Sequence, residues 1–376
     1  MKLALITPFP PYRGGISKHS ENLYNELRKN NDVIVYSFSR LYPEILFPGT
    51  NQYLENSEYN DTKSIRSIDS LNPKTWKLTS ENILEKKIEH VVIRYWNPFF
   101  IFAYSSIIKY LRKRNKKIKI FAICDNIISH ENLYFEKLLV KSFIRKLDGI
   151  IVMSDNVKRK LLTLNNNINY KKIFLPILED LGDKINIKHA KKELSLNSDK
   201  IVFLFFGLIR EYKGLDVLIS AINLIDKDLI GKFEFIIVGE NYEKLDKYKN
   251  NIDADIKGNI KWLTKYIPDE QVNLYFCASD FVVLPYKSAS QSGIVPMAYH
   301  FGKPIIVSDV EGLSEMVVNY ITGYIFENKN INDLKYILEN CIINSKNDID
   351  ENMINRFYRK LSTRKYAQNI INFLNE

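Results

Sequence analysis

The chain has 376 residues, of which 45% are hydrophobic and 26% are charged, and its formal net charge is +10. Single cores usually stop growing at about 250–300 residues, so two domains are expected, and the ordinary apolar and charged fractions exclude general disorder and a fibrous architecture. The three cysteines are too widely spaced for a disulfide framework or a metal site, which favours a reducing, cytoplasmic location.

The first half alternates short apolar runs with helical patterns, which is typical of parallel sheets covered by helices. The runs that predict buried strands are residues 3–8, 32–38, 90–96, 119–124 and 149–154. Residues 19–29 and 135–146 have the apolar spacing of amphipathic helices. The residues expected to face inward in the second of these helices are Leu138, Leu139, Phe143 and Ile144.

Residues 174–197 break this rhythm with a proline, a glycine and a charged stretch that lacks a strand pattern, so they are predicted to be a linker. The strand pattern then restarts at residues 200–207, 233–240, 259–263, 280–286 and 303–309. The sequence therefore predicts an α/β protein with two doubly wound domains, 1–182 and 183–357. A last helix, about 358–376, is expected to pack back on the first domain.

The first candidate motif is PPYRGGIS, residues 10–17, between the first strand and the first helix. The adjacent Gly14 and Gly15 allow the backbone to approach a ligand, and the next helix presents free N–H groups to an anion. A plain strand-to-helix turn is the alternative, because this motif lacks the full GxGxxG spacing of dinucleotide folds.

The second motif, FFGLIREYKG, opens the second half in the same order of strand, loop and helix. Gly207 ends the strand, and Arg210 and Lys213 project from the loop. Two cations at a strand end suit a diphosphate, which gains charge as it leaves. The alternative is a solvated loop whose cations pair with Glu211 or Asp216.

The third motif is LPYKSASQSGIVPMAYHFGKPIIVSDVEGLSE. A short helix is predicted to start near Ile294, which places Gln291, Ser292 and Gly293 at its N-terminus, where hydroxyl and N–H donors converge on a phosphate. Residues 312–315 are expected to open a later helix, which places Glu315 at the same sheet edge, either as a capping carboxylate or as a ligand contact.

In this order and separation, the three motifs closely resemble family 4 retaining glycosyltransferases of the GT-B fold. The segments SRLYPEILFPG, IRYWNPFF and CDNIISHE look like a bacterial branch of that family, and the likeness covers nearly the whole chain. The resemblance implies two Rossmann-like domains facing across a cleft, with the acceptor mainly on the first domain and the nucleotide-sugar donor mainly on the second.

Site residues follow from the resemblance, with Arg210, Lys213 and the 291–294 turn meeting the diphosphate and the base lying near 265–267. The donor-binding set is Gly14, Gly15, Gly207, Arg210, Lys213, Ile267, Ser290, Gln291, Ser292, Gly293, Ile294 and Glu315. The acceptor-binding set is His19, Asp125, Asn126 and His130, and the catalytic set is Arg210, Lys213, Asp125 and His130.

Two departures from the family concern acidic residues and histidines. Many relatives carry a pair of carboxylates in the third motif, at positions that hold Ala289 and Met297 here, so donor contacts are expected to fall to Glu315, Ser290 or Lys287.

The second departure is Asp125 of CDNIISHE, which stands where many relatives carry a histidine near the reacting centre. His300, the histidine of the third motif, is expected to have a packing role.

Retaining transfer without a nucleophile requires positioning and stabilisation of the leaving diphosphate. Front-face substitution is therefore expected, with the acceptor hydroxyl losing its proton in part to the departing phosphate oxygen. No metal or other cofactor is expected, since the DxD-like stretch 253–255 lies in a polar segment and is predicted to be a surface loop.

Basic residues are concentrated in two clusters, 109–119 and 137–146. They predict a surface that faces an anionic membrane, with solvated helix ends as the alternative. Because no uncharged apolar run of 18 residues occurs, the chain is not expected to span a membrane. The cysteine usage and the basic clusters together predict a cytoplasmic protein that is peripheral on the inner face of the cytoplasmic membrane. The clusters lack the interleaved aromatic residues of single-strand binders, so no nucleic-acid partner is expected.

The sequence therefore predicts transfer of a hexose-type sugar from a UDP or GDP sugar to a glycan or polyprenyl-linked acceptor in the assembly of bacterial surface polysaccharide or glycoconjugates. One alternative is a non-catalytic GT-B protein that binds nucleotide sugar within a glycan-assembly complex. A sugar-nucleotide epimerase would need a set of acids and histidines that this chain lacks.

Overall fold

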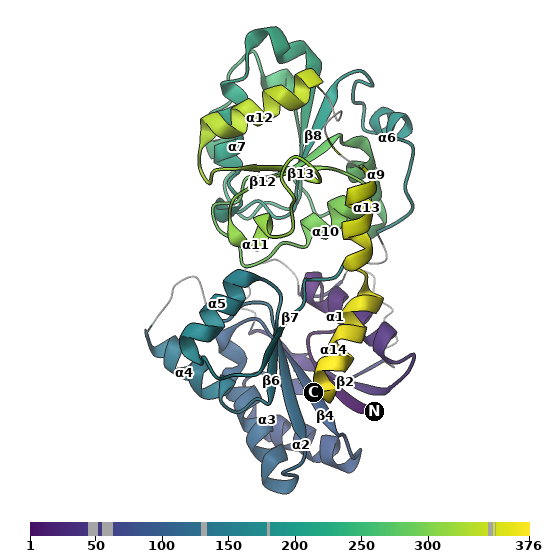
Figure 1. Cartoon of the computed structure of the whole chain (residues 1–376), viewed down its shortest axis with the longest axis vertical. Helices are drawn as coiled ribbons and strands as arrows, with labels where there is room; N and C mark the ends of the chain where they lie inside the picture. The colour runs from purple at the N-terminus through teal and green to yellow at the C-terminus, as the bar shows by residue number, and fades with distance from the viewer. Residues whose placement is uncertain (44–51, 55–62, 129–133, 179–180, 345–348, 350) are drawn as a thin grey trace. The chain divides into compact units, whose positions relative to one another are not determined.

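The computed structural model describes residues 1–43, 52–54, 63–128, 134–178, 181–344, 349 and 351–376. The chain divides into two compact units (Figure 1): Met1–Pro176 with Thr363–Glu376, and Ile177–Ser362. The division falls inside the predicted linker, 174–197, and the last helix of the chain belongs to the first unit.

The first unit contains a seven-stranded parallel sheet with the order β3-β2-β1-β4-β5-β6-β7. The chain starts in the middle of this sheet, runs to one edge and then continues on the other side of β1, which is the doubly wound arrangement. The strands are β1 (Lys2–Ile6), β2 (Asp32–Arg40), β3 (Ser64–Asp69), β4 (His90–Tyr95), β5 (Lys119–Cys124), β6 (Gly149–Val152) and β7 (Tyr170–Lys172).

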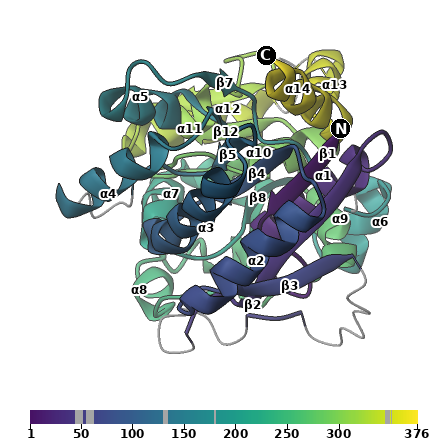
Figure 2. The ribbon, with the colours of Figure 1, turned by 90° about the horizontal axis from the view of Figure 1, so that it is seen from below.

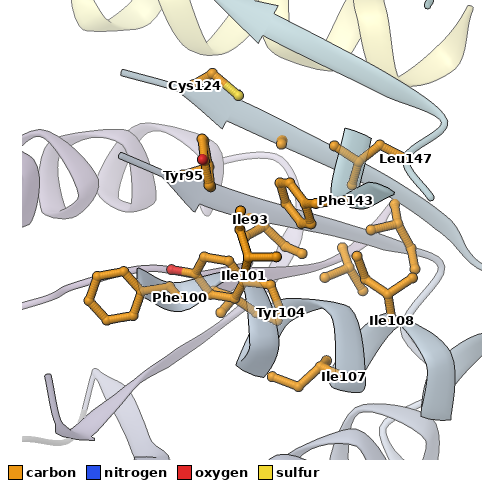
Figure 3. Packing of buried hydrophobic residues seen from close by; sticks show 14 of the residues in the cluster. Ile93, Tyr95, Phe100, Ile101, Tyr104, Ile107, Ile108, Cys124, Phe143 and Leu147 are labelled. Carbon is orange, nitrogen blue, oxygen red and sulfur yellow. The ribbon is translucent and has the colours of Figure 1, made fainter. Parts of the chain in front are cut away.

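Helices cover both faces of this sheet, because alternate strand residues point to opposite faces. In β1, Leu3 and Leu5 join one apolar cluster with α1 and α14, which lie side by side (Figure 2). Ala4 and Ile6 join another cluster with α2 to α5, and Figure 3 shows the part of it formed by β4, α3 and α4. The helices are α1 (Gly15–Leu27), α2 (Pro73–Glu85), α3 (Ile101–Arg114), α4 (Tyr134–Ile144), α5 (Asp155–Leu164) and α14 (Thr363–Asn375).

The second unit contains a six-stranded parallel sheet with the order β10-β9-β8-β11-β12-β13. Its strands are β8 (Ile201–Phe206), β9 (Phe233–Val238), β10 (Ile260–Leu263), β11 (Phe281–Leu284), β12 (Ile305–Ser308) and β13 (Gly323–Phe326). Its core includes Phe203 of β8, whose ring stacks on Phe235 of β9 and Phe281 of β11. The core continues into α7 and α12.

The helices of the second unit are α6 (Ile187–Glu193), α7 (Leu215–Asn223), α8 (Asp246–Lys249), α9 (Asp269–Ala278), α10 (Ile294–His300), α11 (Glu311–Ser314), α12 (Ile331–Asn344) and α13 (Glu351–Lys360). The short 3-10 turns η3 (Glu211–Lys213), η4 (Lys227–Lys232) and η5 (Lys257–Asn259) also belong to the second unit, whereas η2 (Pro98–Phe100) belongs to the first. The predicted last helix is divided: α13 packs on α10 in the second unit, and α14 packs on α1 in the first.

The prediction of two parallel-sheet domains is confirmed, and each of the ten predicted strands overlaps an observed one. The strands β3, β7 and β13 were not predicted. All three are edge strands, and β3 and β7 are largely polar, so they lack the continuous apolar run of a strand buried on both faces. Leu138 was wrongly predicted to face inward: its side chain is 53% exposed on α4.

Among the helices of the described residues, none is both long enough and apolar enough to span a bilayer.

Candidate functional site

Two loops leave the second sheet at the point where the direction of winding reverses. Strands β8 and β11 are neighbours, and the chain crosses from them toward opposite edges of the sheet. Ligands of open α/β sheets bind at such a switch point, outside the carboxyl ends of the strands. The Lys213 loop (residues 207–214) follows β8 and the serine loop (residues 285–293) follows β11, so the second and third motifs meet there.

Contacts between main-chain atoms hold these two loops together. The N–H of Lys287 donates to the carbonyl of Tyr212 over 2.7 Å. Gly214 has φ 69°, and a Cβ atom at this position would lie 1.8 Å from the carbonyl oxygen of Pro285. Glycine is therefore required at residue 214 by both its backbone conformation and its packing.

Lys213 is a cation without an acidic partner among the residues that the structure describes. Its Nζ donates to the hydroxyl of Tyr286 over 2.5 Å and lies 4.2 Å from the centre of that ring. Burial, with a smaller contribution from the charge of Arg210, lowers the pKa of Lys213. Gly207 lies beside it, since a Cβ there would be 3.5 Å from Nζ and 3.9 Å from Cδ1 of Ile294.

Arg210 lies half-buried in the same loop, with its guanidinium 4.6 Å from the centre of the Tyr242 ring. Its Nε is buried and has no hydrogen-bond acceptor among the described residues. Asp216, one of the two acids that could have neutralised these cations, pairs instead with Lys287 at 2.7 Å. The Lys213 loop therefore offers two cations to a ligand.

The serine loop supplies the start of α10, as the third motif predicts. Gly293 is the residue before the helix, and the buried Ser292 hydroxyl accepts the N–H of Ile294 over 3.2 Å. Ser292 also hydrogen-bonds Tyr286, the partner of Lys213. Gln291 is half-buried in this loop.

Ser290 packs against the start of α11, where a Cβ at Gly312 would lie 2.6 Å from its carbonyl carbon. The helix expected to open over residues 312–315 is the short α11, which spans Glu311–Ser314, so Glu315 follows its last residue. An N-terminal cap is thereby ruled out for Glu315, which is half-buried. Ile267 is buried in the loop after β10, at the same carboxyl edge of the sheet.

The positions that replace the family's carboxylates have buried side chains, with Ala289 9% exposed and Met297 6% exposed. Of the residues expected to take over the donor contacts, Lys287 is already paired with Asp216. Neither Ala289 nor Met297 can contribute a charge to a ligand.

In the first unit, the GG motif spans the start of α1: Gly14 is the residue before the helix, and Gly15 is its first residue. Gly14 has φ 112°, and a Cβ at Gly14 or Gly15 would meet no atom within 4 Å. The N-terminus of α1 receives no side-chain cap. Open space and uncapped N–H groups leave room for an anion beside this backbone.

Asp125 lies at the end of β5, where it holds a buried arginine. Arg94, near the end of β4 and 3% exposed, donates from Nε and Nη2 to the two carboxylate oxygens, each over 2.5 Å. Burial opposes the charge of Arg94, but the attraction of Asp125, together with smaller contributions from Tyr366 and Cys124, outweighs burial and raises the pKa of the guanidinium. Asn126 follows and is half-buried.

His19 of α1 belongs to the same neighbourhood and is 6% exposed. Burial, followed by the positive charge of Arg94, lowers its pKa to about 3, so the ring is neutral at physiological pH. Its Nδ1 has no hydrogen-bond partner among the described residues. His19, Arg94 and Asp125 are thus brought together from three elements, whereas His130 lies outside the described residues.

Two residues of these sites were not singled out from the sequence, Arg94 and Tyr286. The signal for Arg94 was its place as a charged residue inside the apolar run HVVIRYW. The signal for Tyr286 was an aromatic hydroxyl directly after a buried strand, opposite the Lys213 loop.

Other sequence candidates lie apart from these two sites. His300 contacts the ring of Phe301 and the hydroxyl of Tyr358, which agrees with a packing role. Asp253 and Asp255 are exposed, as expected of a surface loop. Within the described ranges, no group of three histidine, cysteine or acidic side chains could hold a metal ion.

Comparisons with known proteins identify the second unit. Residues 186–360 match the family model for "Glycosyl transferases group 1". The chain is 23% identical to an uncharacterized glycosyltransferase of Methanocaldococcus jannaschii, MJ1069, over 95% of both chains. It is 28% identical to the lipopolysaccharide 1,2-N-acetylglucosaminetransferase of Salmonella typhimurium, over 36% of this chain and 37% of that protein.

A solved structure of Anabaena Alr3699/HepE in complex with UDP superposes with a TM-score of 0.74 at 14% identity and covers 100% of both chains. This likeness establishes the fold. The chain therefore has the GT-B fold, and its residues 186–360 form a domain of the group 1 glycosyltransferases.

Proposed function

We propose that this protein is a metal-independent, retaining glycosyltransferase of family 4. It transfers a hexose-type sugar from a UDP or GDP sugar to a glycan or polyprenyl-linked acceptor in surface polysaccharide or glycoconjugate assembly. The observation that carries the proposal is Lys213, a cation held by the Tyr286 hydroxyl at the switch point of a group 1 glycosyltransferase domain. Its surroundings supply no competing acid among the described residues.

In this proposal the Lys213 loop and the start of α10 receive the donor diphosphate. Lys213 and Arg210 neutralise the charge that develops on the leaving group, and main-chain N–H groups after Ser292 add hydrogen bonds. The two cations lie near each other before the anion arrives, since the charge of Arg210 already acts on Lys213. Their mutual repulsion is relieved when the diphosphate binds, and relieved further as its charge grows during transfer.

The proposed transfer proceeds on one face of the sugar. The bond between the anomeric carbon and the diphosphate oxygen breaks, the acceptor oxygen bonds to that carbon from the same face, and the acceptor proton passes to the departing phosphate oxygen. This route needs positioning and charge stabilisation rather than a protein nucleophile. In the first unit, His19, Asp125, Asn126 and His130 are proposed to contact the acceptor, and Gly14 and Gly15 to contact the donor phosphate.

A screen of purified protein against common nucleotide sugars tests the proposal. We expect slow release of UDP or GDP from one donor without an acceptor, and faster release with a membrane extract that contains the acceptor. EDTA should leave the rate unchanged, and NMR of the product should show the anomeric configuration of the donor. Inversion of configuration, or full loss of activity in EDTA that a divalent cation restores, would contradict the retaining, metal-independent mechanism.

The alternative is a non-catalytic partner that binds nucleotide sugar within a glycan-assembly complex. Ala289 and Met297, which stand where many relatives carry carboxylates, favour it. The same screen separates the two: donor binding by calorimetry without hydrolysis or transfer, with every acceptor tested, supports the partner role.

We further propose that the enzyme works in the cytoplasm, at the inner face of the membrane, where it meets a polyprenyl-linked acceptor. The basic clusters 109–119 and 137–146 support this location, because lysine and arginine are attracted to anionic lipid surfaces. Co-sedimentation with vesicles of phosphatidylglycerol, set against vesicles of phosphatidylcholine, tests it, and equal binding to both would contradict it.

A further inference from the structure

A cavity of about 660 Å³ lies in the first unit between α3 and the chain that joins α4 to β6. Residues of α3 from Phe102 to Arg112 form one wall, and residues 145–148 form the other. This volume is in the range of small-molecule sites. One carboxylate oxygen of Asp148 accepts the N–H of Ile120 over 2.6 Å, so this end of the cavity lies at the start of β5. Asp125 follows the last residue of β5, so the cavity and the Asp125 site lie at opposite ends of this strand.

The charges that line the cavity are mostly positive: Lys109, Arg112, Arg145 and Lys146, against the single acid Asp148. Asp148 is already engaged, since Arg112 donates to it over 2.8 Å and the N–H of Ile120 shares the same oxygen. Within the described part of the chain, the ion pairs include none to Lys109, Arg145 or Lys146. The cavity therefore holds an excess of positive charge.

The two lysines lie close enough to affect each other. Burial, and after it the charge of Lys109, lowers the pKa of Lys146. Like charges brought together without a counter-charge cost free energy in the empty protein. An anion placed between them would remove that cost.

Two donors of the cavity lack hydrogen bonds. The Nε of Arg112 and the hydroxyl of Ser105 are buried and have no partner among the described residues. Buried donors of folded proteins are nearly always satisfied by protein, water or ligand, so these two indicate a polar occupant. Both belong to α3, on the side of the helix that lines the cavity.

The cavity also has an apolar side. Phe102 lines it at the other end of α3 with a side chain that is 59% exposed. Ile108 and Leu147 border it and belong to the buried cluster drawn in Figure 3. A ligand that enters would meet cations at one end of the helix and an exposed aromatic ring at the other.

We propose that this cavity is a second anion site, which binds the phosphate group of a ligand through Lys109, Arg112 and Lys146. Four cations, one engaged acid and two unsatisfied donors form a site suited to the several acceptor oxygens of a phosphate. The phosphate can belong to a soluble anion or to a lipid headgroup whose chain leaves past Phe102. The proposal does not depend on glycosyl transfer.

The full-length protein is titrated with inorganic phosphate, with dihexanoyl phosphatidic acid below its micelle concentration, and with dihexanoyl phosphatidylcholine. Calorimetry gives the affinity, and hydrogen exchange followed by mass spectrometry locates the site. We expect protection in peptides that cover 101–114 and 145–150. Phosphate bound at the Lys213 loop would leave these two segments unprotected, so the readout separates this site from the donor site.

The variant Lys109→Gln/Lys146→Gln should weaken binding at least about tenfold, since each lost charge-assisted hydrogen bond contributes substantially to affinity. The matched control, Lys86→Gln/Lys87→Gln, removes the same charge from two exposed lysines of the first unit that lie outside both basic clusters. If the first variant unfolds, Arg145→Gln and its control Arg28→Gln, both at exposed residues, replace the pair.

The titrations distinguish a soluble ligand, a lipid headgroup and the absence of a specific site. Binding of inorganic phosphate that depends on the cavity lysines supports a soluble ligand, and binding of phosphatidic acid alone supports a lipid headgroup. Equal weakening in both variants would show diffuse attraction to surface charge and overturn the site. Absence of protection in both segments with every ligand would overturn it too, as would equal affinity for phosphatidylcholine.

Discussion

Arg94 in the first unit and Lys213 in the second are cations near the carboxyl edge of a parallel sheet, but their partners differ. Arg94 is held by both oxygens of Asp125 at 2.5 Å, whereas Lys213 is held by the hydroxyl of Tyr286. A buried cation with its own carboxylate is satisfied within the protein, while one held by a neutral hydroxyl keeps its charge for an incoming anion. The availability of charge, rather than its position in the fold, distinguishes the two sites.

The largest expected effect comes from removing the carboxylate of the paired cation. Asp125→Ala leaves Arg94 buried and unpaired, which should destabilise the first unit by about 3–5 kcal/mol. Guanidinium unfolding followed by the fluorescence of Trp76 and Trp96, in a Trp262→Phe background, measures this unit. The control Arg94→Met/Asp125→Leu removes both charges and should recover most of the loss. A loss below about 1 kcal/mol for the single variant would mean that Arg94 is hydrated or paired elsewhere.

Removing the available cation should affect activity more than stability. Lys213→Ala is expected to lower kcat by about 100- to 1,000-fold in the donor-release assay, as for other residues that stabilise charge in a transition state. The control Lys227→Ala removes a lysine whose side chain is 85% exposed, and its rate should match that of the parent protein. An unchanged kcat for Lys213→Ala would refute the diphosphate assignment.

The pH dependence of stability tests the charge balance around Arg94. The pKa of His19 is about 3 in the folded protein against 6.5 for a free histidine, so between these values the unfolded chain binds a proton that the folded chain does not. The folded state therefore loses stability as pH falls through this window, by about 1.5 kcal/mol down to about pH 5.

Unfolding in the Trp262→Phe background should show this loss, and His19→Gln should lack it. An equal slope of stability against pH in both proteins would show that His19 becomes charged within the fold.

The smallest effect is expected from the hydroxyl that holds Lys213. Tyr286→Phe keeps the ring and removes the hydrogen bond, so Lys213 should be less well oriented and kcat should fall about three- to tenfold. Tyr212→Phe serves as the control, because the centre of the Tyr212 ring lies 5.7 Å from Nζ of Lys213. A fall as large as that of Lys213→Ala would indicate that the tyrosine hydroxyl contacts the substrate directly.

The sequence predicted the parts of the fold and site that depend on local pattern. Strands buried on both faces form continuous apolar runs, so β1, β8 and β11 could be recognised, whereas the largely polar edge strands β3 and β7 could not. The Lys213 loop and the start of α10 were predicted because glycines, cations and a serine-rich turn lie within short segments.

The pairing of Arg94 with Asp125 could not be predicted, because these residues are 31 positions apart and meet through the adjacency of β4 and β5. Likewise, the position of Glu315 depends on where α11 begins. That boundary is not marked by a capping side chain, because the residue before α11 is Val310, which makes no side-chain cap.

The helix α14 has a consequence for how the chain folds during synthesis. Its residues Tyr366, Ile370 and Phe373 complete the apolar cluster that contains Leu3 and Leu5, and Tyr366 also hydrogen-bonds Arg94. These residues are synthesised after residues 177–362, which form the second unit. The first unit is therefore expected to complete this face of its sheet only after the whole second unit has been synthesised.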